Sequence, residues 1–478
     1  MSAISGENEE MCYPIPFGVT QALSEYAIAL KYGNLDSETL KRVAMFLVDY
    51  VSAVHAGYRV NGDFNESLAS ILFMESAPGC FSSVFFSGKK LSPMRASFLN
   101  ASYAHGADMD DGSRSAMGHV GAHVISACVA LCEARNLSNA ALVEALVVGY
   151  DVYCRLSAAA QPQMVHRGFH STGMAGAPAC AAACAKLLGL DRSGIYHAIA
   201  ISATQASGLL LVGETGQEIK PINPAKAAEA GLLSALLAEK GVVGPKDPLE
   251  SSKGWFHAVS SEVDLERVLD GLGEKFAINS CYMKPYPSCR HTHCGLDAAR
   301  KIRGVVGGLP IKAAVLHTYS NAIRLAGEIA IPETSGEAKF SIQYAIACML
   351  VRGHFGLSDL DVRDMDPNVA KLCERIELRP DDAYEDASRG VRGAKLEILL
   401  ENGARHNCTV LVPKGEPENP FLIGDCIEKL VNCVWSDCSN RSQKEEIAGA
   451  FIEAVFSFVA SPAAPFCFSD LIVEGGAL

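Results

Sequence analysis

The chain has 478 residues, of which 49% are hydrophobic and 20% are charged, and its formal net charge is −13. This is the composition of a globular protein large enough for two domains. The acidic balance argues against nucleic acid as a partner, because phosphate binding needs a broad basic face. The best apolar stretch, residues 44–57, is broken by Asp49 and His55, so we expect no membrane span. Residues 1–12 contain no lysine or arginine and resemble neither a signal nor a transit peptide, which predicts a cytoplasmic protein.

The first half of the chain is predicted to be consecutive helices. Apolar residues recur at helical spacing, with Asp36 or Ser37, Asp191 and Asn223 as N-caps and Gly241 as a stop. The expected helices cover residues 40–56, 119–134, 137–155, 173–188, 191–207 and 224–240. The run at 173–188 is so rich in Ala, Gly and Cys that we expect it to be packed on all sides.

The second half mixes strands with helices. Residues 313–319, 394–400 and 405–412 alternate as strands do, whereas 338–353 and 423–459 have helical spacing. The simplest arrangement is a mainly α protein with an inserted α+β domain. A large all-helical domain would comprise residues 1–274 and 406–478, and a smaller α+β lid domain would comprise residues 275–405.

The 17 cysteines indicate neither a disulfide framework nor a metal site. Many lie in Ala-rich apolar stretches, where a cysteine is usually a small buried hydrophobe. No CxxC pair occurs. The tight group of Cys289, His291, His293 and Cys294 does not have the spacing of a zinc site, so we expect no metal.

The stretch from His105 to Arg114 is the first segment with chemical potential. It contains three carboxylates, which are Asp108, Asp110 and Asp111. Buried together, three carboxylates repel one another unless cations neutralise them or one stays protonated. The alternative is an acidic surface loop between helices.

Two further segments place cationic groups before predicted helices. His170 precedes the small-residue helix, and Lys220 precedes the helix that Asn223 would cap. Helix N-termini favour anions, so either residue could bind a carboxylate, and a neutral His170 could act as a base. The alternatives are a structural histidine and a solvated lysine.

Residues 284–293 are the most informative segment. Lys284, Arg290 and His291 offer a point charge and a guanidinium fork suited to carboxylates, against an acidic background. A charged surface loop is the alternative. Together, these segments predict a polycarboxylate site, where cations stabilise the charge that builds up when a proton leaves next to a carboxylate. No P-loop, GxGxxG or GxSxG motif supports ATP, NAD or serine-hydrolase chemistry.

Several motifs in one order make the chain resemble the MmgE/PrpD family, which includes 2-methylcitrate dehydratases, cis-aconitate decarboxylases and iminodisuccinate epimerases. The resemblance covers nearly the whole chain. It rests on His105–Asp111, Gly168–Gly173, Ala203–Leu209, Lys220-Pro221 with Ala227–Leu232, Lys284–His293, Pro332–Thr334 with Ala338–Ser341, and Pro417–Pro420.

The resemblance implies a large all-α domain with a smaller α+β lid, usually in a homodimer, and a cofactor-free site between the domains. It implies that the catalytic pocket residues are Asp108, His119, His170, Lys220, Lys284 and Tyr319. His105 and Asp111 belong to the same motif, and Arg290 and His291 resemble further substrate contacts on the lid side.

This chain departs from the family at three places. Members often carry Asp-Asp-Thr or Asn-Asp-Thr followed by Trp, whereas Asp111 is followed here by Gly112, Ser113 and Arg114. The usual His-Pro is His119-Val120, and the usual His-Pro-Thr-Gly begins His170-Ser171.

We therefore expect a lyase acting on a citrate- or aconitate-like acid, with dehydration of a 2-methylcitrate or alkylcitrate type narrowly favoured. Lys220, Lys284 and Arg290 would hold carboxylates, His170 or His119 would move the proton, and Asp108 would assist. The alternatives are cis-aconitate decarboxylation, an iminodisuccinate-type epimerase, and a non-catalytic carboxylate-binding protein.

Overall fold

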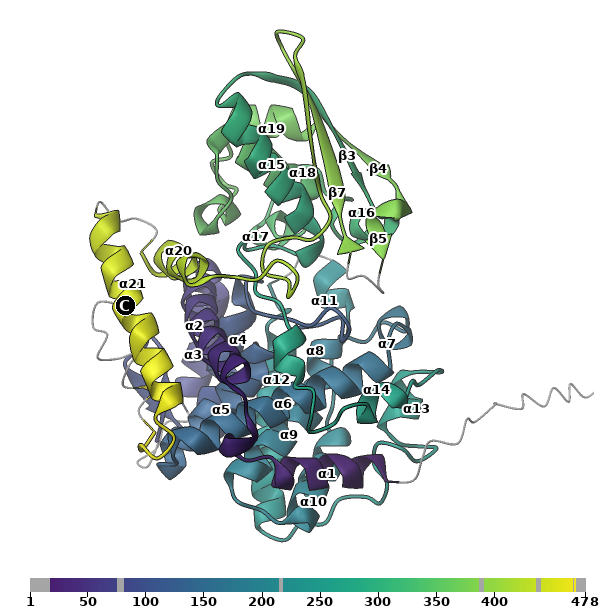
Figure 1. The fold of residues 1–478 in the computed structure, drawn as a ribbon, viewed down its shortest axis with the longest axis vertical. Helices are drawn as coiled ribbons and strands as arrows, with labels where there is room; N and C mark the ends of the chain where they lie inside the picture. Colours follow the sequence, from purple (N-terminus) through teal and green to yellow (C-terminus); the bar gives the residue numbers. More distant parts are fainter. Residues whose placement is uncertain are drawn as a thin grey trace, which may run out of the picture.

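The computed structural model describes residues 18–74, 81–214, 218–386, 391–435, 440–466 and 468–469. Figure 1 shows a larger helical body below a smaller one that contains a sheet. Each has its own hydrophobic core: one is built from residues 19–283 and 421–468, the other mainly from residues 286–410. The predicted fold class, mainly α with an inserted α+β domain, is confirmed.

The larger domain is built from both ends of the chain, because the two C-terminal helices pack against α2 (Figure 1). Its long helices are α1 (Val19–Ala29), α2 (Ser37–Val60), α3 (Gly62–Phe73), α4 (Pro93–Gly106), α5 (Gly121–Arg135), α6 (Asn139–Ala159), α9 (Gly176–Leu187), α10 (Arg192–Ala203), α12 (Ile222–Glu239), α20 (Ile423–Val434) and α21 (Arg441–Ala460). Shorter helices are α7 (Gln163–His166), α8 (Ser171–Met174), α11 (Leu211–Glu214), α13 (Trp255–Val259) and α14 (Glu266–Leu269), and β1 (Ser82–Val84) pairs with β2 (Lys89–Leu91).

The predicted helix signals hold with one exception. Asp36 and Asp191 cap α2 and α10, each accepting a backbone N–H of the first turn. Gly241 follows α12 in the left-handed region with φ +82, as a stop residue should. However, Asn223 is not the cap of α12, because the helix begins one residue earlier, at Ile222, and the Asn223 side chain bonds His170 instead.

Small residues let the central helices approach closely, as the composition of residues 173–188 predicted. Almost all of α9 is buried, including Cys180 and Cys184. At Gly231 of α12, an added Cβ would lie only 2.3 Å from the Cβ of Cys180. Glycine is therefore required where these helices cross, and the cysteines serve as small core residues.

The smaller domain contains a four-stranded sheet in the order β4-β3-β7-β8. Its elements are α15 (His293–Val306), β3 (Ile311–Thr318), α16 (Ser320–Ala326), α17 (Ser335–Ala338), α18 (Ile342–Arg352), α19 (Pro367–Cys373), β4 (Ile376–Pro380), β7 (Ala394–Leu400) and β8 (Arg405–Val410), with β5 (Glu385–Asp386) and β6 (Val391–Arg392) as a separate pair. Every second residue of β7 is buried, and α15 packs against β7 and β8, so one face of the sheet is covered by helix. Strand β4, which the sequence did not reveal, pairs in parallel with β3 at the edge.

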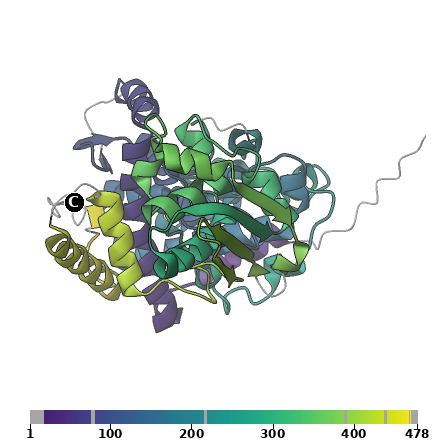
Figure 2. The ribbon, with the colours of Figure 1, turned by 90° about the horizontal axis from the view of Figure 1, so that it is seen from above.

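The two cores meet close to the expected lid boundaries of residues 275 and 405. Phe276 and Met283 still pack in the first core, whereas Tyr286 begins the second. Strand β8 continues the lid sheet to Val410, beyond the expected end, because its pairing with β7 starts at Arg405. Figure 2 looks down on the smaller domain, which covers central helices of the larger one, with α20 and α21 at one edge.

Within the described residues, we find no helix that combines the length and the apolar character needed to cross a bilayer.

Candidate active site

Asp108 is the centre of a buried charge cluster at the junction of the two domains. It lies in the loop between α4 and α5, in the left-handed region with φ 52, where aspartate is among the residues that fit. Its Oδ1 lies 3.0 Å from the Nζ of Lys220 and 3.1 Å from the Nζ of Lys284. Lys220 comes from the larger domain just before α12, and Lys284 lies where the two cores meet. One carboxylate oxygen therefore binds two lysines from distant parts of the chain.

His119 joins the same carboxylate, so we call Asp108, Lys220, Lys284 and His119 the Asp108 cluster. The Nε2 of His119 lies 3.5 Å from Asp108 Oδ1, and its Nδ1 lies 3.2 Å from Asp110 Oδ1. The side chains of His119 and Lys220 are 12% and 15% exposed, whereas Lys284 is fully buried. The cluster is thus closest to solvent at His119 and Lys220.

The charges of the cluster hold Asp108 ionised. Burial alone would raise the pKa of Asp108, but the ammonium groups of Lys220 and Lys284 outweigh it and hold that pKa well below its usual range. Burial lowers the pKa of Lys284, and the attraction of Asp108 and Asp110 opposes this shift. A cationic pocket with a lysine of lowered pKa can bind an anion and exchange a proton with it.

Two neutral histidines complete the wall of the cluster. Burial lowers the pKa of His105 to about 4, and its Nδ1 lies 2.8 Å from Asp110 Oδ2. Burial, reinforced by the charge of Lys220, holds the pKa of His170 well below its usual range. Asn223 Nδ2 lies 2.9 Å from Nδ1 of His170 and can only donate, so Nε2 keeps the ring hydrogen. His170 can then donate a hydrogen bond to a ligand without carrying charge.

A metal ion is not what this arrangement favours. His105, Asp108, Asp110 and His119 have ligand atoms within 4.8 Å of one another and form the one such group in the described part of the chain. However, the two lysine ammonium groups on Asp108 repel a divalent cation and already use the carboxylate oxygen that would bind it.

Asp111 lies next to the cluster in sequence but has different partners. Its carboxylate accepts hydrogen bonds from the backbone N–H of Gly121, at 2.6 Å, and from the hydroxyl of Tyr150. Burial, which outweighs these bonds, raises the pKa of Asp111 to about 7. The backbone oxygen of Asp111 lies 3.0 Å from His119 Nδ1, so this contact helps to fix the position of the His119 ring. The partners of this carboxylate are thus the backbone of Gly121 and the hydroxyl of Tyr150.

Arg290 belongs to a second group of charges, the Glu416 cluster, which consists of Glu416, Glu418, Arg114 and Arg290. Nε and Nη2 of Arg290 lie 3.0 and 2.9 Å from Oε1 of Glu416, and Arg114 Nη1 lies 3.0 Å from Oε2. Arg114 also binds Glu418 at 2.7 Å. Arg114 therefore joins the loop after Asp111 to Glu416, and the guanidinium of Arg290 is already bound by a carboxylate.

His291 and Tyr319 form a third pair, on the lid side. Nδ1 of His291 is hydrogen-bonded to the hydroxyl of Tyr319. Burial holds the pKa of His291 well below its usual range, and the charge of Lys284 adds to this shift. Among the described residues, no hydrogen bond or ion pair joins this pair to the Asp108 cluster.

Three site residues were not predicted. Asn223 was interpreted as a helix cap, Lys339 only as part of the Ala338–Ser341 motif, and Glu416 not at all. The signal for Lys339 was a lysine between the apolar residues Ala338 and Phe340. In the structure its side chain is buried and donates to Gly106 O at 2.9 Å. Glu416 could have been found as the carboxylate directly before the motif Pro417–Pro420.

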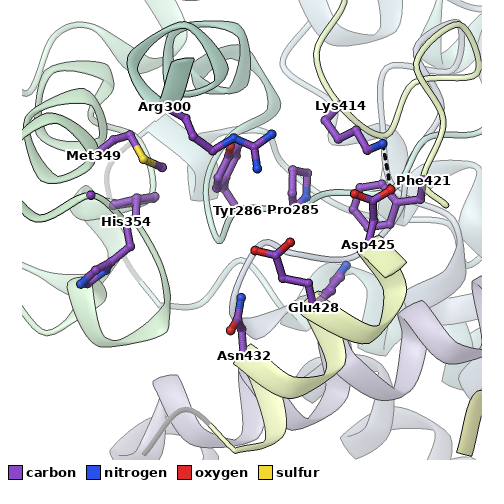
Figure 3. Close-up of a pocket in the computed structure, with 13 residues that line it drawn as sticks. Pro285, Tyr286, Arg300, Met349, His354, Lys414, Phe421, Asp425, Glu428 and Asn432 are labelled. Carbon is purple, nitrogen blue, oxygen red and sulfur yellow. Dashed lines mark ion pairs between the residues drawn. The ribbon is translucent and has the colours of Figure 1, made fainter. Parts of the chain in front are cut away.

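A separate cleft of about 130 Å³ lies between the domains, next to the segment that carries Lys284 (Figure 3). Tyr286 and Arg300 of the smaller domain line one side, and Asp425 and Glu428 of α20 line the other. Lys414 enters the cleft and pairs with Asp425 at 2.8 Å. Since both signs of charge are present, this cleft lacks the preference for anions that the Asp108 cluster has.

Both domains of a known protein family match this chain. The MmgE/PrpD N-terminal domain matches residues 21–268, and the MmgE/PrpD C-terminal domain matches residues 286–452. A cis-aconitate decarboxylase of Aspergillus terreus is 25% identical over 84% of this chain and 86% of its own length. The human cis-aconitate decarboxylase is 26% identical over 81% of each chain. A cis-aconitate decarboxylase-like protein of Aspergillus oryzae is 25% identical over 83% of this chain and 86% of its own length. With both family domains matched in order across most of its length, the chain belongs to the MmgE/PrpD family.

Proposed function

We propose that this protein is a lyase that removes CO₂ from a cis-aconitate-like tricarboxylate. The observation that carries the proposal is the Asp108 cluster, in which two lysines and a histidine meet one buried aspartate at the domain junction. The sequence narrowly favoured dehydration of a 2-methylcitrate type. The relatives named above favour decarboxylation, which was the stated alternative.

The reaction needs one proton and charge stabilisation. In such a substrate, the bond between the saturated carbon and its carboxylate breaks, and the released electron pair forms a new double bond to the central carbon. The far carbon of the original double bond takes a proton, so a trianion and one proton become a dianion and CO₂. The two carboxylates that remain need cations throughout, and Lys220 and Lys284 supply them.

We assign the proton donation to His119. Asp108 and Asp110 flank its two ring nitrogens at 3.5 and 3.2 Å, so the ring is held in place between two carboxylates. It is also the histidine of the cluster that is partly exposed, which permits reprotonation from solvent. His170, which stays neutral and donates from Nε2, would orient a carboxylate.

The test is the product formed from a panel of acids in D₂O. The purified protein is incubated with cis-aconitate, 2-methylcitrate and iminodisuccinate, and products are identified by proton NMR and mass spectrometry. We expect CO₂ release from cis-aconitate and one deuterium on the carbon that receives the proton. Loss of water from 2-methylcitrate alone would support the dehydratase, and deuterium exchange without loss of water or CO₂ would support an epimerase.

The same preparation tests the expected homodimer. Light scattering should give twice the 50.7 kDa mass of the chain. A monomer that turns over cis-aconitate would leave the proposed chemistry intact and remove the expectation of a dimer.

A further inference from the structure

Lys339 brings a third lysine to the Asp108 cluster and has no carboxylate partner. It follows α17, and its residue is 6% exposed. Its Nζ donates to the backbone oxygen of Gly106 at 2.9 Å, and no ion pair forms with any carboxylate in the described part of the chain. An ammonium group has three N–H donors, so this lysine retains donors for a ligand.

Lys339 differs from the two other lysines near Asp108. Lys220 and Lys284 both contact Asp108, and Asp110 is the second buried aspartate. The ammonium of Lys339 has no such carboxylate contact among the described residues, and His105 and His170 beside the cluster are neutral. A buried charge without a partner is costly, so a bound carboxylate would stabilise Lys339.

The environment of Lys339 agrees with a role in binding an anion. Burial lowers the pKa of Lys339 to about 8, and the charges of Lys220 and Lys284 add to the shift. Asp108 and Glu218 oppose it from beyond ion-pair distance. A carboxylate bound to Lys339 would reverse the shift, and the complex would take up a proton near pH 8.

The position of Lys339 is fixed by both domains. Its backbone oxygen accepts from the N–H of Cys289 at 2.8 Å, within the segment that also carries Lys284. Its Nζ reaches Gly106, which follows His105 at the end of α4. Because backbone groups on two sides hold it, the ammonium is already oriented before a ligand arrives.

We propose that Lys339 is a further substrate-binding residue, which binds one carboxylate of the tricarboxylate while Lys220 and Lys284 hold the others. This inference rests on the proposed function, because it assumes a substrate with several carboxylates. It adds a residue that neither the family motifs nor the composition had assigned to the substrate.

The test is binding of tricarballylate, a saturated tricarboxylate that offers no double bond to react. Calorimetric titrations at pH 7, 8 and 9, each in two buffers of different ionisation enthalpy, measure both affinity and proton uptake. We expect the wild type to take up a proton near pH 8 and to lose about tenfold in affinity per pH unit above it. Lys339→Arg, whose guanidinium stays charged, should keep the pH 7 affinity and lose both the proton uptake and the decline.

The second variant at this position is Lys339→Met, and Lys186→Met is its matched control. Lys186 is another largely buried lysine, but it binds Glu144 and backbone oxygens in the larger domain. We expect Lys339→Met to lose at least about tenfold in affinity at pH 7, and Lys186→Met to lose none. Unchanged affinity and proton uptake in both Lys339 variants would overturn the inference. Should Lys339→Met not fold, Lys339→Arg alone decides, through its pH dependence. If the wild type binds no tricarboxylate and turns none over, the proposed function has failed instead.

Discussion

Asp108 and Glu416 are two buried carboxylates, and each binds two basic side chains from distant parts of the chain. They differ in which of their oxygen atoms these side chains occupy. Glu416 is bound on Oε1 by Arg290 and on Oε2 by Arg114. Asp108 is bound by two lysines through the single oxygen Oδ1. Both oxygens of Glu416 are therefore occupied by arginines, whereas the two lysines on Asp108 meet at one oxygen.

The difference follows from the chemistry of the two cations. A planar guanidinium binds a carboxylate in a fixed fork, which suits a permanent link between the domains. An ammonium is a point charge that shifts its pKa when buried, which suits binding of a ligand and proton exchange. With Glu418, the Glu416 cluster has two charges of each sign, whereas Lys339 beside the Asp108 cluster has no carboxylate partner among the described residues. We therefore assign the Glu416 cluster to domain attachment and the Asp108 cluster to the substrate.

The largest effect that separates the two clusters should come from Lys284→Met. The change removes one cation from the substrate but keeps most of the side-chain volume, so we expect turnover of cis-aconitate to fall by about 10²–10⁴-fold. The melting temperature should change little, since Lys220 still neutralises Asp108. Steady-state rates and thermal melts measure both, with Lys186→Met as the control that keeps its activity. Retained turnover in folded Lys284→Met would remove Lys284 from the site.

Glu416→Gln should have the opposite effect, with a large loss of stability and a small loss of turnover. It leaves two arginines without their shared carboxylate, and breaking a buried ion pair in this way costs about 3–5 kcal/mol. Turnover should fall far less than for Lys284→Met, since no group of the Asp108 cluster is lost. Urea unfolding measures the stability.

The matched control for Glu416→Gln is Glu418→Gln. Glu418 pairs with the same Arg114, but its side chain is 43% exposed, so the loss should stay below about 1 kcal/mol. Equal losses for the two variants would contradict the role of Glu416 as the buried link.

A third carboxylate, Asp111, extends the comparison, because hydrogen bonds rather than cations surround it. In the folded protein, the carboxyl group of Asp111 stays protonated up to about pH 7, whereas in the unfolded chain it loses its proton near the ordinary pKa of 3.8. The folded state therefore binds more protons between these values, and the contribution of Asp111 to stability falls as the pH rises from about 4 to 7.

Asp111→Asn removes this titration. The stability of the variant relative to the wild type should increase by about 2 kcal/mol or more between pH 4 and 7, and stay level above pH 7. Urea unfolding at a series of pH values measures the difference, in which the other titrating groups cancel. A difference that does not change with pH would show that Asp111 is ionised in the folded protein throughout this range.

Much of the fold could be predicted from local signals. The caps Asp36 and Asp191 and the stop at Gly241 depend on residues within one turn, so the sequence reveals them directly. Strand β7 was predicted at its exact bounds because one of its faces is buried and its side chains alternate. Strand β4 was missed because its place is set by parallel pairing with β3, sixty residues away.

The candidate site was predicted only as a set of residue types. The sequence singled out His105, Asp108, His119, His170, Lys220 and Lys284, and the structure brings these six together. It could not separate Asp108 from Asp111, three positions away, because their environments depend on Lys284 and Tyr150 from other elements. For the same reason, Arg290 was expected to hold a substrate carboxylate and is instead bound to Glu416.

By itself, the sequence determined the fold class and the order of helical and mixed segments, and it predicted a cluster rich in cations. These properties follow from periodicity, caps and residue types, which act over a few positions. The tertiary structure decided which cations remain available, because the state of a buried charge depends on partners that folding brings within about 3–4 Å. It assigned Arg290 and Arg114 to Glu416, gathered Lys220 and Lys284 on Asp108, and left Lys339 without a carboxylate partner among the described residues.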